Sequence, residues 1–171
     1  MLSTIAKGTD LPFRERLPEV WHQAADIAGL DVETLYAITL VESQRAVSKG
    51  SVLEAVPHPY TLRSPYGSRM FQTRRAAEIE LQAMIEAGIT NIDIGIAQIN
   101  LHWHGDRVEK PSDLFDIETN LRVAADILAE AGRTAQSLEQ QIARYHTWTD
   151  VERGSRYSNR VLMIKERLQR L

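Results

Sequence analysis

The chain has 171 residues, of which 43% are hydrophobic and 25% charged, and its formal net charge is -3 at pH 7. This length and composition predict a single domain, 1–171, with 1–14 as an irregular N-terminal segment and a core that needs no metal or disulfide. The charge gives no footprint for nucleic acid, no apolar run is long enough to span a bilayer, and the absence of cysteine excludes thiol catalysis and thiolate metal sites.

Two helices are predicted in the first quarter of the chain. Apolar residues recur at helical spacing from Leu17 to Ala28, and Gly29 is placed to end that helix. Asp31 can cap the next helix, which contains residues 35–44.

The second of these helices contains an unusual carboxylate. At roughly 100° per residue, Leu35, Ile38 and Glu42 lie on one stripe, so Glu42 takes a position where an apolar residue is expected. A carboxyl in such a place either raises its pKa or finds donors, which makes Glu42 a candidate general acid. The alternative is that Glu42 ends the helix and turns to solvent or pairs with Arg45.

The middle of the chain changes character. Residues 49–72 are rich in Gly and Pro, and they predict one small β-hairpin formed by residues 60–63 and 68–72. Thr73 then caps a helix that is predicted to run through Ala87, with Gly88 as its terminator.

Residues 89–101 predict a firmly anchored loop. The segment begins with strand-like alternation and tightens after Gly95, and its isoleucines point inward. Asp93, Gln98 and Asn100 are the polar exceptions, and a loop held in this way can present their side chains accurately.

The rest of the chain predicts three more helices. Asp116 opens one, Ser137 and Gln140 form a capping box for a short one, and the last begins at about residue 157. The sum is a mainly α fold of about six or seven helices with one small hairpin. The last helix and the residues just before it form a basic face, interpreted as solvated unless an anionic partner binds it. Its residues are Arg153, Arg156, Arg160, Lys165, Arg167 and Arg170.

Several chemistries are excluded by spacing, among them the Gly-x-Ser-x-Gly elbow, the phosphate-binding loop and the His-Glu-x-x-His zinc pair. His102, His104 and Asp106 form the one metal-like cluster, but a further committed ligand is not evident, so neither a metal nor a cofactor is predicted. Tyr145 and Trp148 suit the stacking of sugar rings, although aromatic residues in such positions are more often part of the core.

Four short stretches resemble, in chain order, the motifs of the soluble lytic transglycosylase domain. Val41-Glu-Ser-Gln44, Gly95-Ile-Ala-Gln-Ile-Asn100 and Ala143-Arg-Tyr-His146 are similar to its Glu-Ser, Gly-x-x-Gln-x-x and Ala-x-Tyr-x signatures. Asp116-Ile-Glu-Thr-Asn-Leu-Arg122 resembles its Asp-x-x-x-Asn helix start. The resemblance covers roughly residues 35–171 and implies a lysozyme-like fold. Ala97 and His146 depart from it, since the family usually has Met and Asn there.

The resemblance implies cleavage of the β-1,4 bond between N-acetylmuramic acid and N-acetylglucosamine in peptidoglycan strands. Glu42 would be the single acid and base and would leave a 1,6-anhydro end. Ser43, Gln98 and Asn100 are expected to hold the sugar, Tyr145 to orient Glu42, and His146 to supply a hydrogen bond.

Two alternatives remain open. Asp93 is the nearby candidate for a second acid, and with it the protein would be a hydrolysing muramidase. A non-catalytic module that binds glycan or an envelope protein is the other. For a peptidoglycan enzyme we expect a periplasmic location with the export signal removed. The longer connection between the first two motifs is similar to the branch of small periplasmic transglycosylases that accompany conjugation and secretion machines, which are therefore the expected protein partners.

Overall fold

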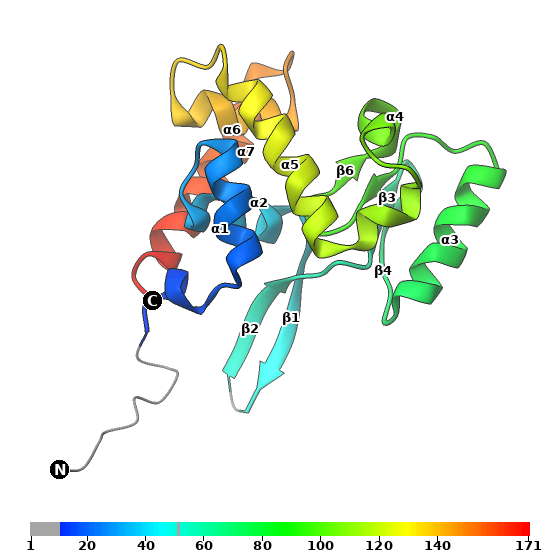
Figure 1. Ribbon diagram of the computed structural model, residues 1–171, viewed down its shortest axis with the longest axis horizontal. Coiled ribbons are helices and arrows are strands. Elements are labelled where there is room, and N and C mark those ends of the chain that lie inside the picture. The colour runs from blue at the N-terminus through cyan, green and yellow to red at the C-terminus, as the bar shows by residue number, and fades with distance from the viewer. Residues whose placement is uncertain (1–10, 51) are drawn as a thin grey trace.

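Figure 1 shows the computed structural model of the chain, which describes residues 11–50 and 52–171. Within these ranges the fold is mainly α, as predicted, with small antiparallel sheets. The α-helices are α1 (Glu19–Ala28), α2 (Val32–Ser43), α3 (Arg74–Glu86), α4 (Leu101–His104), α5 (Ile117–Gly132), α6 (Leu138–His146) and α7 (Val151–Leu168). The 3-10 helices are η1 (Phe13–Arg16), η2 (Gly105–Arg107) and η3 (Pro111–Phe115).

Side-chain caps begin the helices where the sequence predicts them. Asp31, Thr73, Asp116 and Ser137 each accept a hydrogen bond from the backbone N–H three residues later. At Ser137 the capping box is incomplete, because the Gln140 side chain accepts from the N–H of residue 136 instead of residue 137. The last helix begins at Val151, earlier than predicted, because the Asp150 side chain caps it.

The strands form two sheets, so the prediction of a single hairpin is wrong. The strands are β1 (Gln44–Lys49), β2 (Val52–Pro57), β3 (Thr61–Ser64), β4 (Gly67–Met70), β5 (Asp93–Ile94) and β6 (Ile99–Asn100). The predicted hairpin, β3 and β4, belongs to a four-stranded sheet in the order β4-β3-β5-β6, whereas β1 and β2 pair separately and extend from the body (Figure 1). The extra hairpin escaped prediction because its half-buried positions include Arg45 as well as Val47, so no apolar alternation marks it.

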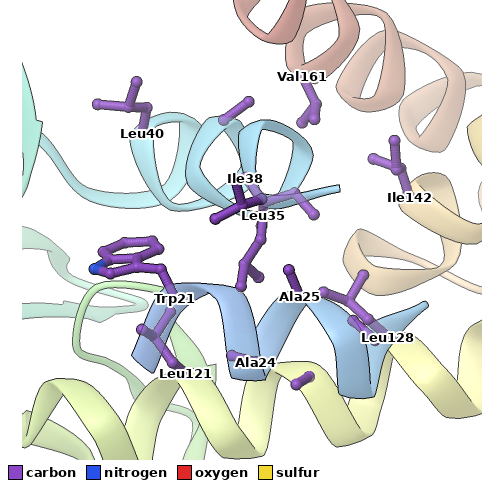
Figure 2. Packing of buried hydrophobic residues seen from close by; sticks show 14 of the residues in the cluster. Trp21, Ala24, Ala25, Leu35, Ile38, Leu40, Leu121, Leu128, Ile142 and Val161 are labelled. Carbon is purple, nitrogen blue, oxygen red and sulfur yellow. The ribbon is translucent and has the colours of Figure 1, made fainter. Parts of the chain in front are cut away.

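Helix α2 lies at the centre of the main core. Its Leu35 and Ile38 are fully buried, and Figure 2 shows them between side chains of α1, α5, α6 and α7. An apolar helix enclosed on several sides is held rigidly. The position of its last turn, which contains Glu42, is therefore fixed by the core.

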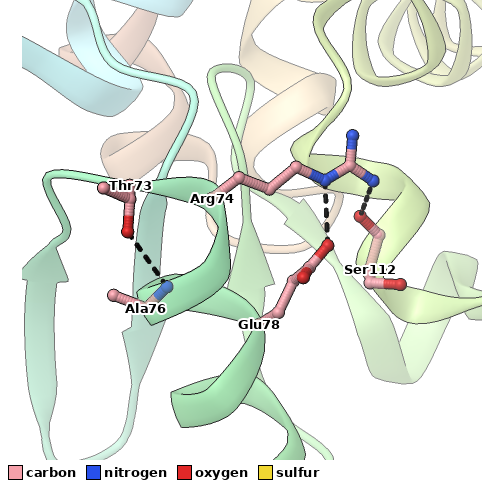
Figure 3. Close-up of polar contacts among 5 residues, drawn as sticks. All are labelled: Thr73, Arg74, Ala76, Glu78 and Ser112. Carbon is pink, nitrogen blue, oxygen red and sulfur yellow. Dashed lines mark hydrogen bonds and ion pairs between the residues drawn. The ribbon is translucent and has the colours of Figure 1, made fainter.

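A second cluster lies beneath the four-stranded sheet and α3. It includes Leu62, Ile94 and Ile99 from the strands and Phe115 from η3. The start of α3 is tied to η3 by Arg74, whose guanidinium reaches the carboxylate of Glu78 at 2.9 Å and the backbone carbonyl of residue 112 at 3.3 Å (Figure 3). In residues 11–50 and 52–171, none of the helices has the length and apolar run that a membrane crossing requires.

Candidate active site

A cleft of about 960 Å³ separates the helical core from the sheet. Its walls combine side chains from the end of α2, strands β3, β5 and β6, helices α4, α5 and α6, and the start of α7. The residues that matter most here are Glu42, Arg63, Asp93, Gln98, Trp103 and Trp148. The structure therefore brings Glu42 together with polar residues of the predicted loop.

Glu42 occupies the wall of this cleft on the last turn of α2, half-buried above Ile38. Burial raises the pKa of its carboxyl to about 7, and the nearby Asp93 charge adds to the increase. The Tyr157 hydroxyl, Arg63 and Arg160 act in the opposite direction. A carboxyl with this pKa is partly protonated at neutral pH, so it can both donate and accept a proton.

Tyr157 is one of the residues beside Glu42 that the sequence analysis did not predict, together with Arg63 and Arg160. The Tyr157 side chain is buried, and its hydroxyl lowers the pKa of the nearby Glu42 carboxyl. Within the described residues, no atom lies in hydrogen-bond geometry with this hydroxyl. Tyr145, expected to orient Glu42, donates its hydroxyl to the Ala97 carbonyl at 2.7 Å and lines the same cleft as Glu42. Its spacing with Val161 marks Tyr157 only as a core residue, so the sequence contains no signal for its place beside Glu42.

Asp93 is positioned by its neighbours in the sheet. It lies opposite Arg63 on β3 and opposite Asn100 on β6. The Asn100 amide donates to its carboxylate at 2.7 Å. Burial raises the pKa of Asp93, while Asn100, Arg63 and Arg153 oppose the increase. Asp93 is thus a second carboxyl in the same cleft.

Asn100 and Ser43, both predicted to hold a sugar, have their polar atoms engaged within the protein. The Asn100 amide also donates to Asn91, and its oxygen caps α4 by accepting from the N–H groups of residues 102 and 103. The Ser43 hydroxyl is buried and donates to the Ile96 carbonyl at 2.7 Å, which ties α2 to the loop. The structure places both residues as supports of the site, with Asn100 also lining the cleft.

Gln98 lines the cleft in a strained backbone conformation. Its φ of 51° lies in the left-handed region, which is uncommon for a residue with a side chain. Its amide nitrogen donates to the carbonyls of Gly95 at 2.9 Å and Thr61 at 3.3 Å. These bonds fix the amide plane and leave its oxygen as the atom that can meet a ligand.

Gly95 and Asn120 hold this loop against α5. Gly95 has a φ of 86°, and a Cβ atom there would lie 2.2 Å from the Asn120 amide nitrogen. The buried Asn120 side chain accepts from the Ala97 N–H and donates to the carbonyls of Ile94 and Leu114. Asn120 of the Asp-x-x-x-Asn stretch therefore holds the loop through these three hydrogen bonds, which we call the Asn120 bracket. Ala97 is fully buried.

His146 lines the same cleft as Glu42, next to the start of α7. Its ring stacks on that of Tyr157 with 4.4 Å between centroids, and its Nε2 accepts from Arg153 Nε at 3.0 Å. Burial lowers the pKa of His146, and Arg153, Arg63 and Arg160 lower it further. Its imidazole therefore acts as a neutral acceptor.

Two exposed tryptophans line the cleft. Trp103 on α4 and Trp148 after α6 are 71% and 60% exposed, and the Arg144 guanidinium lies 4.9 Å from the Trp148 ring. Exposed aromatic faces inside a cleft are suited to stacking on rings.

Within the described residues, no group of three His, Asp or Glu side chains could hold a metal ion, and His102, His104 and Asp106 do not form such a group.

Comparisons of the chain with protein-family models, with curated proteins and with solved structures found no match.

Proposed function

We propose that the protein is a peptidoglycan lytic transglycosylase of the lysozyme-like kind, with Glu42 as its single acid and base. The supporting observation is a carboxyl with a pKa of about 7 in the wall of a large cleft. The substrate, peptidoglycan, is proposed because the motifs that contain Glu42, Gln98, Asn120 and Tyr145 resemble, in the same order, those of the soluble lytic transglycosylase domain.

The reaction then proceeds in two proton transfers. Protonated Glu42 donates to the glycosidic oxygen, and the bond from that oxygen to C1 of muramic acid breaks. The substrate's own acetamido oxygen supports the positive C1, so no second carboxylate is needed. Ionised Glu42 next takes the proton of the C6 hydroxyl, whose oxygen bonds to C1 and closes the 1,6-anhydro ring. No water is consumed, and Glu42 is protonated again.

The rest of the cleft would bind the strand. The faces of Trp103 and Trp148 stack on sugar rings, and the Gln98 amide oxygen accepts from an acetamido N–H or a hydroxyl. Because peptidoglycan lies outside the cytoplasmic membrane, the site of action is proposed to be periplasmic. Local opening of the wall for an envelope-spanning secretion or conjugation machine is the proposed role.

A hydrolysing muramidase is the second candidate, and Asp93 favours it. The Asp93 charge raises the pKa of Glu42, so the two carboxyls lie close enough to interact. In an inverting glycosidase a second carboxylate activates water on the far side of the sugar. Ionised Asp93 would have this task, with Asn100 holding it in place.

The chemistry of the product ends decides between the two candidates. Purified peptidoglycan digested by the protein should yield muropeptides with 1,6-anhydro ends, measured by mass spectrometry. Reducing ends that disappear in an Asp93→Asn variant would establish the muramidase instead. Anhydro ends that persist in that variant would leave Glu42 as the only acid and base.

The rate of cleavage should fall as pH rises through about 7, because ionisation removes the proton that Glu42 donates. Well above this pH we expect kcat/KM to fall about tenfold per pH unit. Initial rates of muropeptide release from about pH 5 to about pH 9 measure this decrease in kcat/KM. A rate that stays constant to the top of this range would contradict the role of Glu42 as the acid.

A further inference from the structure

A second, smaller hollow of about 340 Å³ adjoins the cleft on its α7 side. It shares Glu42, Arg63, His146 and Arg153 with the cleft, so the two are continuous at the acid. Four arginines surround it: Arg63, Arg153, Arg156 and Arg160. We call this hollow the basic basin.

Positive charge dominates the basic basin. Glu42 is the one carboxyl in its lining, and burial keeps the pKa of Glu42 at about 7. Arg156 forms an exposed ion pair with Glu152, and Arg153 donates one N–H to His146. The guanidiniums of Arg63 and Arg160 both lower the pKa of Glu42, which shows that their fields converge on the acid.

The arrangement of these arginines follows from the packing of α7. Arg153, Arg156 and Arg160 are spaced three and four residues apart, so they share one helix face. Gly154 lets α7 approach α6 closely, since a Cβ there would lie 3.1 Å from that of Ala143. The stacked rings of His146 and Tyr157 form a rigid floor. The packing of α7 therefore fixes these arginines close to Glu42.

We infer that the basic basin binds the carboxylates of the peptide stem attached to the muramic acid at the cleavage point. This inference rests on the proposed function. The sugar rings of the strand are neutral, whereas the stem carries free carboxylates and leaves the strand at the muramic acid. Guanidinium groups bind carboxylates through paired N–H donors, and a surface with four of them next to the acid matches that chemistry.

Two forms of one substrate test the inference. In one, the stem carboxylates of soluble peptidoglycan strands are free, and in the other they are converted to primary amides, which have the same shape without charge. We expect kcat/KM to be about tenfold higher for the acidic form. In the double variant Arg156→Gln, Arg160→Gln this ratio should fall close to one. The ratio is the measured quantity because Arg160 also acts on Glu42 and so changes the absolute rate.

The matched control is the double variant Arg167→Gln, Arg170→Gln, which removes the same charge from the same end of the chain but outside the basin. It should keep the ratio of the unmodified protein. Equal rates on the two substrates, or a ratio that survives loss of Arg156 and Arg160, would overturn the inference while the proposed function stands. If neither form is cleaved, the proposed function fails and the inference fails with it.

Discussion

The variant Glu42→Gln should lose the release of muropeptides, with a rate at least about a thousandfold lower than that of the unmodified protein. Glutamine has the size of glutamate but neither donates nor accepts the proton at neutral pH, so both proton transfers stop. Mass spectrometry of the soluble products measures the loss. The control Glu118→Gln makes the same chemical change on an exposed position of α5, and its release should be unchanged.

The stability of Glu42→Gln distinguishes lost chemistry from a lost fold. The folded-state pKa of Glu42, about 7, lies above the ordinary glutamate pKa of 4.5, so folding favours the protonated acid. This contribution is complete below about pH 4.5 and is lost as pH rises through about 7. At about pH 8 the variant should therefore be more stable than the unmodified protein by up to about 3 kcal/mol, with little difference at about pH 4.

Urea unfolding at both pH values measures this difference. A variant that is less stable at both would mean that Glu42 is needed for the fold, and its inactivity would then say nothing about catalysis. Higher stability with no activity is the result expected when a carboxyl is kept in an unfavourable place for its function.

Local signals in the sequence were sufficient to predict most helices. The caps at Asp31, Thr73 and Asp116 depend on a side chain and an N–H three residues away, so a short window contains the whole interaction. The same holds for the end of α1, where Gly29 adopts a φ of 67°. The β1–β2 hairpin lacks such a window, because its strands extend from the body and their burial pattern includes a charged residue.

The candidate site was predicted in part. Glu42 stood out because its position on an apolar stripe is a local property, and Gln98 stood out as a polar residue in an apolar loop. The roles of Tyr157 and Arg160 depend on how α7 packs against α2, and no short stretch of sequence encodes that contact. The hydrogen bonds from Ser43 and Tyr145 to loop carbonyls are equally non-local, so a short stretch of sequence does not predict them.

Gly95→Ala should be the most damaging small substitution in the loop, with a loss of about 4 kcal/mol or more in the free energy of unfolding. The added Cβ would lie 2.2 Å from the Asn120 amide nitrogen and 2.4 Å from the Leu114 backbone carbonyl, and the backbone oxygen has little room to move. Displaced Asn120 would leave its buried partners at Ile94, Leu114 and Ala97 without hydrogen bonds.

Gly88→Ala separates this overlap from the strain of the backbone itself. Gly88 has a φ of 78°, similar to that of Gly95, but a Cβ there meets nothing within 4 Å. Only the left-handed conformation opposes the alanine, so we expect a loss of about 1 kcal/mol and unchanged muropeptide release. Urea unfolding of both variants gives the comparison. Equal losses would mean that the Asn120 bracket yields to the methyl group, whereas a larger loss at Gly95 together with a fall in release shows that the bracket holds Gln98 in the cleft.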